Sequence, residues 1–259
     1  MAKVIFDGTK EAERAAAFLE ESERVLGKSL VIFQCDGRTD ESAYVRLKHE
    51  MGERLGVMVS VIFAKDKSEL AEMIMTANED ETVDGILVQL PIIDHSAQFS
   101  VLSKKETEQI LSTINPEKDI DGLNPKSRFI PAVVRAVERI IEIFKITEDD
   151  EIAVVGAKGS VGVRLMERLK SLGLRAKGFD KGDDLSSLKG FDVIISATGV
   201  TGLVSEAMVA EGFTGIDLGY PKGDFSPAAV SKATLISPVP GGVGPMTIVA
   251  LYENLGDVL

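Results

Sequence analysis

The chain has 259 residues, of which 41 are acidic and 29 basic, so its formal net charge is -12. That balance argues against a nucleic-acid-binding protein, because contacts to phosphate need a basic surface. A single cysteine excludes an internal disulfide, and with only two histidines the sequence predicts no bound metal. The sequence shows no pattern of a secretory leader and no run of ~20 consecutive apolar residues, so we expect a cytoplasmic protein that contacts no membrane.

The first half of the chain alternates between helical and strand patterns. Apolar residues at helical spacing predict a helix over residues 9–28, and the apolar run at 29–35 predicts a buried strand. The alternation continues with a helix over 40–55, a strand over 57–64, a helix that opens with a capping box at 66–69, a strand over 84–91 and a helix over 97–114. This order is typical of a parallel sheet with right-handed crossovers.

A stretch of turn-forming residues between two Asn-Pro dipeptides, at 115–116 and 124–125, marks the expected domain boundary. Beyond it the pattern predicts a helix over 131–144, a strand over 151–155, a helix over 161–172, strands over 174–179, 192–197 and 213–218, and a final helix over 245–255. We therefore predict an α/β protein with two domains. Residues 1–126 form an N-terminal catalytic domain with a parallel sheet, on which residues 240–259 dock, and residues 127–239 form a Rossmann-like nucleotide-binding domain.

A glycine-rich turn follows the predicted strand at 151–155 and leads into a predicted helix. It reads Gly156-Ala157-Lys158-Gly159-Ser160-Val161-Gly162. Glycines here permit a tight turn, and they let backbone N–H groups at the helix N-terminus approach a pyrophosphate. The spacing differs from the usual Gly-x-Gly-x-x-Gly, so a glycine-rich turn without a ligand is the alternative interpretation.

Asp180, at the end of the next predicted strand, suits a carboxylate that accepts a hydrogen bond from the ribose 2′-hydroxyl of a dinucleotide. A carboxylate there would repel the 2′-phosphate of NADP, so we favour NAD over NADP. Lys158, Lys177 and Lys181 are the counterargument, because any of them could bring positive charge to a phosphate. Outside the glycine-rich turn, the predicted cofactor-binding residues are Asp180, Lys181, Thr198, Gly199, Gly219, Tyr220 and Thr247.

Two places in the first half carry polar groups that a plain core does not need. Tyr44 and Lys48 are four positions apart on a predicted helix, so they share one face. A lysine beside a phenol can act as an acid/base pair if burial lowers the pKa of the amine, although the same spacing is common on solvated helices. Gln89 lies inside an apolar run and must meet a polar partner, either a ligand or neighbouring backbone.

Four segments resemble, in order and spacing, the signatures of the bifunctional methylenetetrahydrofolate dehydrogenase/cyclohydrolase family. They are YVRLK at 44–48, DGILVQLP at 84–91, KDIDGLNP at 118–125 and PVPGGVGPMT at 238–247. The resemblance covers nearly the whole chain. It implies a cytoplasmic homodimer of one-carbon metabolism and purine biosynthesis, with a folate cleft between the two domains. The implied reactions are oxidation of 5,10-methylenetetrahydrofolate with NAD or NADP and hydrolysis of the methenyl product to 10-formyltetrahydrofolate.

The resemblance also implies roles for individual residues. Lys48 would be the general acid/base, Tyr44 would stack on or orient the folate, and Gln89 would hydrogen-bond the lysine and tune its pKa. Asp121 would bind the pterin, because a carboxylate can accept hydrogen bonds from the ring N–H and the exocyclic amine. The remaining residues expected to line the folate cleft are Pro240, Gly241, Gly242, Gly244 and Pro245.

Departures from the family pattern cluster in the nucleotide-binding half. The family's loop usually has arginine, serine and proline where this chain has Ala157, Lys158 and Arg164. A cyclohydrolase or folate-binding protein with weakened or lost dehydrogenase activity is therefore the alternative function. An unrelated dehydrogenase that acts on an amino or hydroxy acid is a third possibility, but it leaves the segments at 84–91 and 238–247 unexplained.

Overall fold

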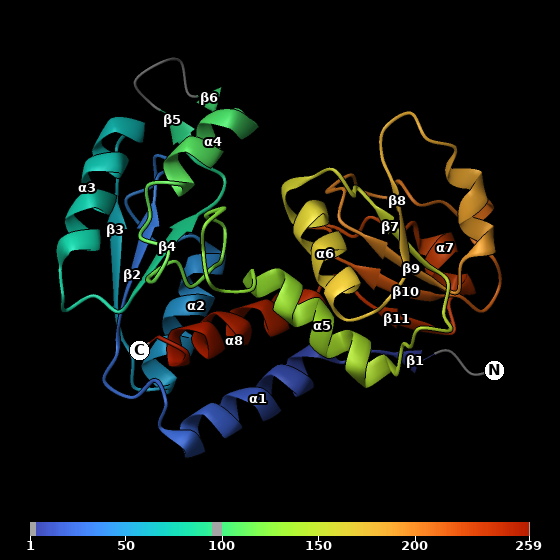
Figure 1. Ribbon diagram of the computed structural model, residues 1–259, viewed down its shortest axis with the longest axis horizontal. Helices are drawn as coiled ribbons and strands as arrows, with labels where there is room; N and C mark the ends of the chain where they lie inside the picture. The colour runs from blue at the N-terminus through green and yellow to red at the C-terminus, as the bar shows by residue number, and fades with distance from the viewer. Residues whose placement is uncertain (1–3, 95–99, 259) are drawn as a thin grey trace. The chain divides into compact units, whose positions relative to one another are not determined.

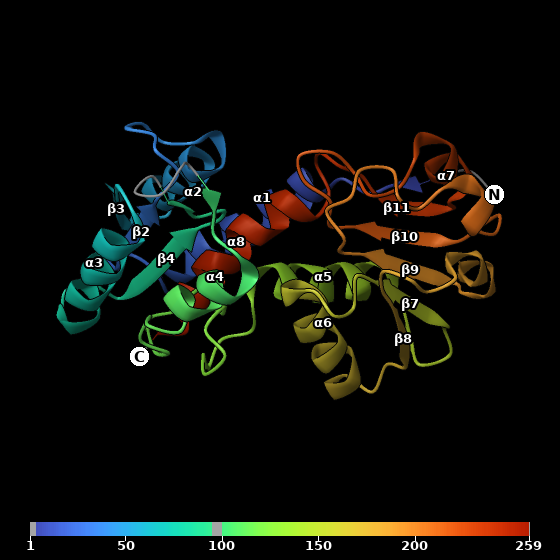
Figure 2. The ribbon, with the colours of Figure 1, turned by 90° about the horizontal axis from the view of Figure 1, so that it is seen from above.

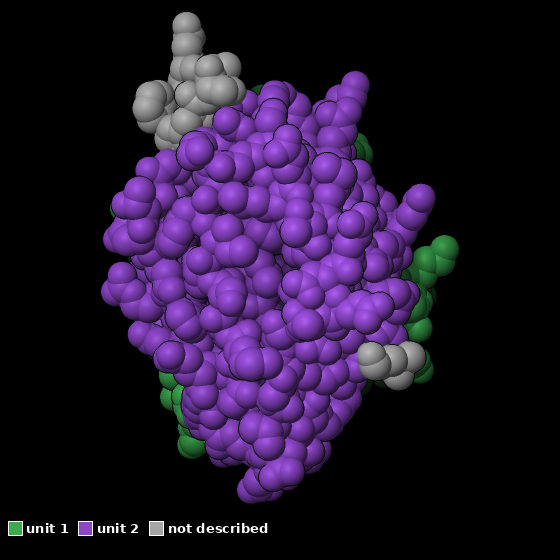
Figure 3. Space-filling view, turned by 90° about the vertical axis from the view of Figure 1, so that its left-hand side faces the viewer, with its two compact units in different colours: residues 1–13, 133–247 green, residues 14–132, 248–259 purple. Residues whose placement is uncertain are grey.

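The computed structural model describes residues 4–94 and 100–258 and divides the chain into two units, which Figure 3 colours separately. Unit 1 comprises Met1–Glu13 and Val133–Thr247, and unit 2 comprises Arg14–Ala132 and Ile248–Leu259. These ranges differ from the expected domain ranges at the N-terminal segment and at the start of the last helix. No helix among the described residues is long and apolar enough to cross a membrane.

Unit 2 is built on a three-stranded parallel sheet in the order β3-β2-β4. The strands are β2 Ser29–Gln34, β3 Met58–Phe63 and β4 Gly85–Gln89, and the helices that follow them are α2 Ala43–Arg54, α3 Lys67–Glu79 and α4 Lys104–Leu111. Figure 1 shows α2 and α3 on opposite sides of the sheet. Because both faces of the central strand β2 are covered, its side chains form a continuous apolar run instead of an alternating one.

Unit 1 contains a six-stranded parallel sheet in the order β1-β11-β10-β9-β7-β8. The strands are β1 Val4–Ile5, β7 Ile152–Val155, β8 Ala176–Phe179, β9 Val193–Ser196, β10 Thr214–Asp217 and β11 Leu235–Ser237. The helices α5 Ala132–Phe144 and α6 Ser160–Ser171 lie side by side along this sheet in Figures 1 and 2, and an ion pair between Arg168 and Glu138 joins them. Two short 3-10 helices, Leu185–Gly190 and Glu206–Met208, and the helix α7 Pro227–Lys232 complete the unit.

Two long helices pass from one unit of the chain to the other. They are α1 Gly8–Ser22 and α8 Val243–Gly256. From Ile248 onward α8 belongs to unit 2, where Leu255 approaches Gly85 of β4. A Cβ at Gly85 would lie 2.9 Å from a Leu255 methyl carbon, so the glycine permits close contact between helix and strand.

The fold class predicted from the sequence is confirmed, and most predicted elements agree with the structure to within about three residues at each end. The prediction for the first helix was too long: α1 ends at Ser22 because Glu23 and Gly27 adopt positive φ angles of 52° and 76° and turn the chain. The predicted helix over 97–114 begins later. Ser103 caps α4 with a complete capping box, and residues 97–99 lie outside the described part of the chain.

Some short elements were not predicted at all. They are β1, β11, α7 and the antiparallel pair β5 Ile93–Asp94 and β6 Ser100–Val101. Each of these strands has only two or three residues, too few to show a period, and each exists through pairing with a partner strand. In β1, Val4 and Ile5 pair with Leu235 and Ile236 of β11, from the far end of the chain.

Candidate active site

The carboxyl ends of β2 and β4 form the edge of unit 2 at which the predicted catalytic residues gather. The chain runs from β2 through α2 to β3 on one side and then returns through α3 to β4 on the other side, so β2 and β4 flank a topological switch point. Ligands of open parallel sheets bind at such a point, outside the carboxyl ends of the strands. Gln34 and Gln89 lie opposite each other in register at this edge.

Gln34 determines where α2 begins. Its amide nitrogen donates to the carbonyl of Asp40 and to the carboxylate of Asp36, both at 3.0 Å, and its oxygen accepts the N–H of Ser42 at 3.0 Å. The Ser42 side chain then caps the helix by accepting the N–H of Val45. Gln34 is not among the residues predicted from the sequence, although it carries the same signal as Gln89: an amide at the end of an apolar strand.

The amine of Lys48 is held in a buried position by neighbouring groups. The side chain projects from α2 and is 4% exposed. Its Nζ donates a hydrogen bond to Gln89 Oε1 at 2.9 Å and lies 4.9 Å from the centroid of the Tyr44 ring. Burial disfavours the charged amine and lowers the pKa of Lys48 to about 8. Gln89 donates its own N–H to the carbonyl of Leu90 at 2.7 Å, which leaves its oxygen to face the lysine.

Asp121 supplies the opposing charge at this site. Its negative charge acts on Lys48 and raises the pKa of the amine, against the larger effect of burial. Burial raises the pKa of Asp121 itself, and the charge of Lys48 opposes that rise. The described residues donate no hydrogen bond to the Asp121 carboxylate, so its oxygens can accept hydrogen bonds from a ligand.

Side chains from the end of the chain hold this part of unit 2 in place. Asn254 of α8 is fully buried, and its amide donates to the carbonyls of Ile120 at 2.8 Å and Ile130 at 2.9 Å, on either side of Asp121. The hydroxyl of the buried Tyr252 donates to the backbone carbonyl of Lys48. The sequence analysis missed both residues; the only local signal was a polar residue inside a largely apolar helix.

In unit 1 the predicted glycine-rich turn connects β7 to α6. A Cβ at Gly162 would lie 2.0 Å from the carbonyl oxygen of Gly156, so only glycine lets the helix pack this closely on the turn. Gly156 has a φ of 85°, which also favours glycine. Gly159 is the N-cap of α6 and offers no side-chain hydrogen bond to the first N–H groups of the helix. These features fit a dinucleotide pyrophosphate, which takes hydrogen bonds from backbone N–H groups at a helix N-terminus.

Asp180 lies next to this turn, at the end of β8. Both of its carboxylate oxygens accept the N–H of Lys158, at 3.1 and 3.2 Å. A Cβ placed on Gly178 would lie 2.6 Å from the Cβ of Ala157, so the turn also packs closely on the strand β8. The ammonium of Lys177 lies 5.1 Å from the ring centroid of Phe179, and Lys181 is exposed. The structure thus places a carboxylate beside the turn and leaves Lys181 on the surface.

The remaining predicted cofactor residues lie in the loops after β9 and β10 and in α8. Thr198 and Gly199 lie in the loop after β9, and Gly219 and Tyr220 lie in the loop after β10. Tyr220 is 68% exposed. Because β7 lies between β8 and β9 in the sheet, the turn after β7 and the loop after β9 flank the switch point of unit 1. The hydroxyl of Thr247 donates to the carbonyl of Val243 inside α8.

The predicted folate-lining residues 240–245 lie in unit 1, between β11 and the first turn of α8. Gly241 has a φ of 93°, and its carbonyl accepts the N–H of Gly8 at 2.8 Å. A Cβ at Gly242 would lie 2.5 Å from the carbonyl oxygen of Pro238, so this turn leaves no room for a side chain there. The loop is therefore compact, with backbone in close contact with backbone.

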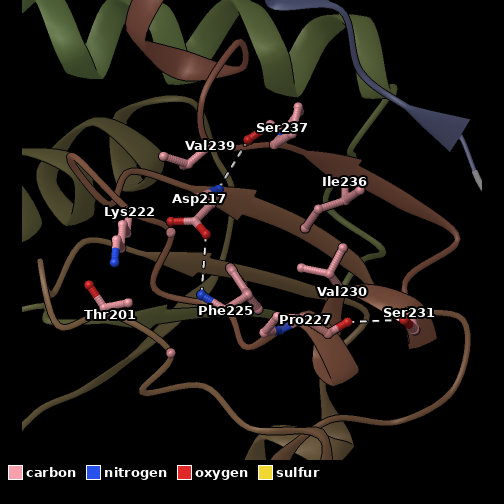
Figure 4. Close-up of a pocket in the computed structure, with 13 residues that line it drawn as sticks. Thr201, Asp217, Lys222, Phe225, Pro227, Val230, Ser231, Ile236, Ser237 and Val239 are labelled. Atoms are coloured by element: carbon pink, nitrogen blue, oxygen red, sulfur yellow. Dashed lines mark hydrogen bonds between the residues drawn. The ribbon is translucent and has the colours of Figure 1, made fainter.

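A pocket of about 400 Å³ opens near the carboxyl ends of β10 and β11 in unit 1 (Figure 4). Its lining includes Thr201, Asp217, Lys222, Phe225, Val230 and Val239. Among the described residues no group of histidine, cysteine, aspartate and glutamate is arranged to hold a metal ion.

Comparisons with known proteins agree with this geometry in both halves of the chain. The family model described as tetrahydrofolate dehydrogenase/cyclohydrolase, catalytic domain, matches residues 2–121, and the model of the NAD(P)-binding domain of the same family matches residues 131–258. The bifunctional protein FolD of Staphylococcus aureus (strain Newman) is 33% identical over 250 residues, which cover 87% of this chain and 83% of that protein. That of Helicobacter hepaticus is 32% identical over 235 residues, with 82% and 79% covered.

Solved structures show the same likeness. The bifunctional FolD enzyme of Campylobacter jejuni superposes with a TM-score of 0.86 at 29% identity, covering 99% of this chain and 98% of that one. The Trypanosoma brucei FolD, complexed with NADP cofactor and inhibitor, gives a TM-score of 0.85 at 25% identity, covering 98% and 96%. With both domains matched and curated relatives above 30% identity, this chain belongs to the tetrahydrofolate dehydrogenase/cyclohydrolase family.

Proposed function

We propose that this chain is a bifunctional enzyme that oxidises 5,10-methylenetetrahydrofolate to the 5,10-methenyl form and hydrolyses that product to 10-formyltetrahydrofolate. The observation that carries the proposal is the buried Lys48 amine, held by Gln89 beside the Tyr44 ring and the charge of Asp121. These groups lie at the sheet edge where a ligand is expected. The named activities of the FolD relatives from S. aureus and C. jejuni support the same reactions.

Lys48 is the acid/base group of the hydrolysis. With a pKa lowered to about 8, a useful fraction of the amine is neutral near physiological pH and can accept a proton from water that attacks the methenyl carbon. The oxygen of Gln89 orients the amine, because the amide is itself anchored on the carbonyl of Leu90. Asp121 accepts hydrogen bonds from the pterin, and Tyr44 packs on or orients the ring.

The dehydrogenase reaction places different demands on the chain. A bound nicotinamide cofactor supplies the hydride acceptor, so no side chain has to act as a base in that step. The glycine-rich turn and the N-terminus of α6 would hold the pyrophosphate, and the loops after β9 and β10 would align the rest of the cofactor. Loss of Lys48 should therefore affect hydrolysis more than oxidation.

The alternative, a cyclohydrolase or folate-binding protein without dehydrogenase activity, is not favoured. The NAD(P)-binding family model matches the whole second half of the chain, and the structure keeps the close contact between Gly156 and Gly162 that a dinucleotide turn requires. The replacements Ala157, Lys158 and Arg164 leave that contact in place.

The function is tested with the purified protein, methylenetetrahydrofolate and either NAD or NADP, by following reduced nicotinamide and, separately, loss of the methenyl compound. We expect both activities in the wild type. Lys48→Met should lower the hydrolysis rate by at least about 100-fold and keep measurable oxidation. Lys65→Met, which changes an exposed lysine of the same unit, should leave both activities unchanged. Normal hydrolysis by Lys48→Met would refute the assignment.

We propose that NAD is preferred over NADP. The support is Asp180, whose carboxylate lies at the turn after β7 and would repel a 2′-phosphate. Asp180→Ser removes the repelling charge, so it should raise kcat/KM for NADP relative to NAD by about tenfold. A tenfold change corresponds to a free-energy difference of about 1.4 kcal/mol. Asp149→Ser, in an exposed turn before β7, is the matched control. A ratio unchanged by Asp180→Ser would contradict this role.

We further propose that the enzyme works as a cytoplasmic homodimer whose product enters purine biosynthesis. The support is the family resemblance. A molar mass in solution near twice 27.8 kDa by light scattering is the expected result for the dimer, and a monomer mass would contradict it.

A further inference from the structure

One carboxylate oxygen in unit 1 collects an unusual number of hydrogen bonds. Asp224 is fully buried, and its Oδ2 accepts the hydroxyls of Ser196 at 2.8 Å and Thr198 at 2.7 Å. The same oxygen accepts the N–H of Thr198 at 2.8 Å and of Gly199 at 3.3 Å. All four donors belong to the end of β9 and the loop directly after it. Asp224 therefore fixes the path of this loop.

A second buried carboxylate holds Asp224 in place. Asp217, the last residue of β10, accepts the N–H groups of Gly219 at 2.8 Å and Asp224 at 3.0 Å on one oxygen and of Phe225 at 3.2 Å on the other. Its own N–H donates to Ser237 at 3.0 Å, and Figure 4 shows the bonds to Phe225 and Ser237. The two aspartates thus connect the loop after β9 to the ends of β10 and β11.

The position of the Asp224 carboxylate lowers the stability of the fold, so packing alone does not explain it. The second oxygen of Asp224, Oδ1, is buried and has no hydrogen-bond partner among the described residues. An unsatisfied buried acceptor costs roughly 1–3 kcal/mol. The chain nevertheless keeps a carboxylate there and directs all four donors to its other oxygen.

The position of the loop after β9 in the sheet suggests what the hydrogen bonds of Asp224 are for. β9 and β10 lie on the opposite side of β7 from β8, and Asp180 directly follows β8. If Asp180 binds the adenosine ribose, the other half of a dinucleotide crosses the switch point and lies over the carboxyl ends of β9 and β10. The backbone at residues 198–199 is then the part of the chain that meets the nicotinamide half.

We propose that Asp224 is a positioning residue for the dehydrogenase reaction: it orders the loop at 196–199 so that this loop aligns the nicotinamide half of the cofactor for hydride transfer. The inference rests on the proposed function. Asp224 does not touch the cofactor; it acts through the loop. Because a displacement of about 1 Å can cost up to 100-fold in rate, loosening the loop should reduce turnover more than it reduces overall stability of the fold.

The test compares Asp224→Asn with the wild type in both reactions and in binding of the reduced cofactor, followed by its fluorescence. Asn keeps the size of the side chain but accepts hydrogen bonds less strongly than a carboxylate. We expect the dehydrogenase kcat to fall at least about tenfold, with a smaller rise in the dissociation constant of the cofactor. Hydrolysis, which depends on Lys48 in unit 2, should stay within about twofold, and amide hydrogen exchange at Thr198 and Gly199 should become faster.

Two further variants make the result decisive. Asp184→Asn, which changes an exposed aspartate whose carboxylate accepts hydrogen bonds from Ser186 at the start of the 3-10 helix Leu185–Gly190, should leave every readout unchanged. Ser196→Ala removes one donor, keeps three, and should lower the dehydrogenase kcat by about two- to threefold; it decides the question if Asp224→Asn does not fold.

The outcomes separate this inference from the function on which it rests. Equal losses of both activities in Asp224→Asn, or a dehydrogenase kcat unchanged in the variant that folds, would overturn the positioning role. A wild-type protein that hydrolyses the methenyl compound but reduces neither NAD nor NADP would instead overturn the proposed dehydrogenase, and with it this inference.

Discussion

The role proposed for Lys48 rests on several effects that act on one amine. Burial lowers its pKa to about 8, while the charge of Asp121 works in the opposite direction. The hydrogen bond to Gln89 fixes where the amine lies. A lysine on a solvated helix would stay fully charged at neutral pH and could not accept a proton. Its position in the core of unit 2 therefore distinguishes Lys48 from a surface lysine with the same spacing to a tyrosine.

The pH profile of hydrolysis should depend on the pKa of Lys48, which burial lowers and the charge of Asp121 raises. The rate requires the neutral amine, so kcat/KM, which reports the pKa of the free enzyme, should rise with pH and level off above about 8. Asp121→Asn removes the negative charge that raises the pKa of Lys48, so the inflection should move to lower pH. Glu50→Gln removes a charge from an exposed position of the same helix and should leave the inflection in place. An inflection that stays at the wild-type pH in Asp121→Asn would contradict the coupling between the two groups.

At the scale of the elements, close approach of backbone decides how the turn after β7 is built. The helix α6 comes so near to the turn that Gly162 faces the carbonyl oxygen of Gly156. That approach brings the first N–H groups of α6 to the position where, in the proposed function, a pyrophosphate would bind. We therefore expect Gly162 to matter both for packing and for binding of the cofactor.

Gly162→Ala should therefore damage both. Its Cβ would meet backbone that cannot move away like a flexible side chain, so we expect a loss of about 2–3 kcal/mol in the free energy of unfolding, as for an overpacked core. The KM for the nicotinamide cofactor should rise as well. Gly190→Ala is the control, because a Cβ there meets no heavy atom within 4 Å. Chemical denaturation and steady-state kinetics measure both effects; equal stability of the two variants would show that the contact is not tight.

For the whole molecule, burial of the Lys48 amine should lower the free energy of unfolding at neutral pH. Because the folded pKa of Lys48 is about 8 and the ordinary value 10.5, the unfolded chain binds more protons between these two values. The free energy of unfolding should accordingly rise with pH across that window. Below it the penalty is fully present, and above it the penalty is gone.

Lys48→Met should consequently be more stable than the wild type at pH 7, by about 1–3 kcal/mol, because each unit of pKa shift corresponds to roughly 1.4 kcal/mol and the loss of a partner for Asp121 offsets part of the gain. The advantage should shrink as the pH rises from about 8 toward 10.5. Urea denaturation of both proteins at several pH values checks this. A variant less stable than the wild type at pH 7 would show that the amine contributes more through its contacts than its burial costs.

The amino-acid sequence was enough to predict the order of most helices and strands, the glycine-rich turn and the group of residues around Lys48. Those features depend on local pattern: hydrophobic periodicity, turn-forming residues and short segments with a recognisable spacing. The folded structure was needed to show that Lys48 is buried and that Gln34 starts α2. It was also needed to show that Asn254 holds the segment around Asp121 and that Asp224 holds the loop after β9. The partners of Asn254 and Asp224 lie far away along the chain, and short strands such as β1 exist only by pairing with distant ones. Hydrogen bonds and burial between distant segments arise when the chain folds, so no local pattern can reveal them.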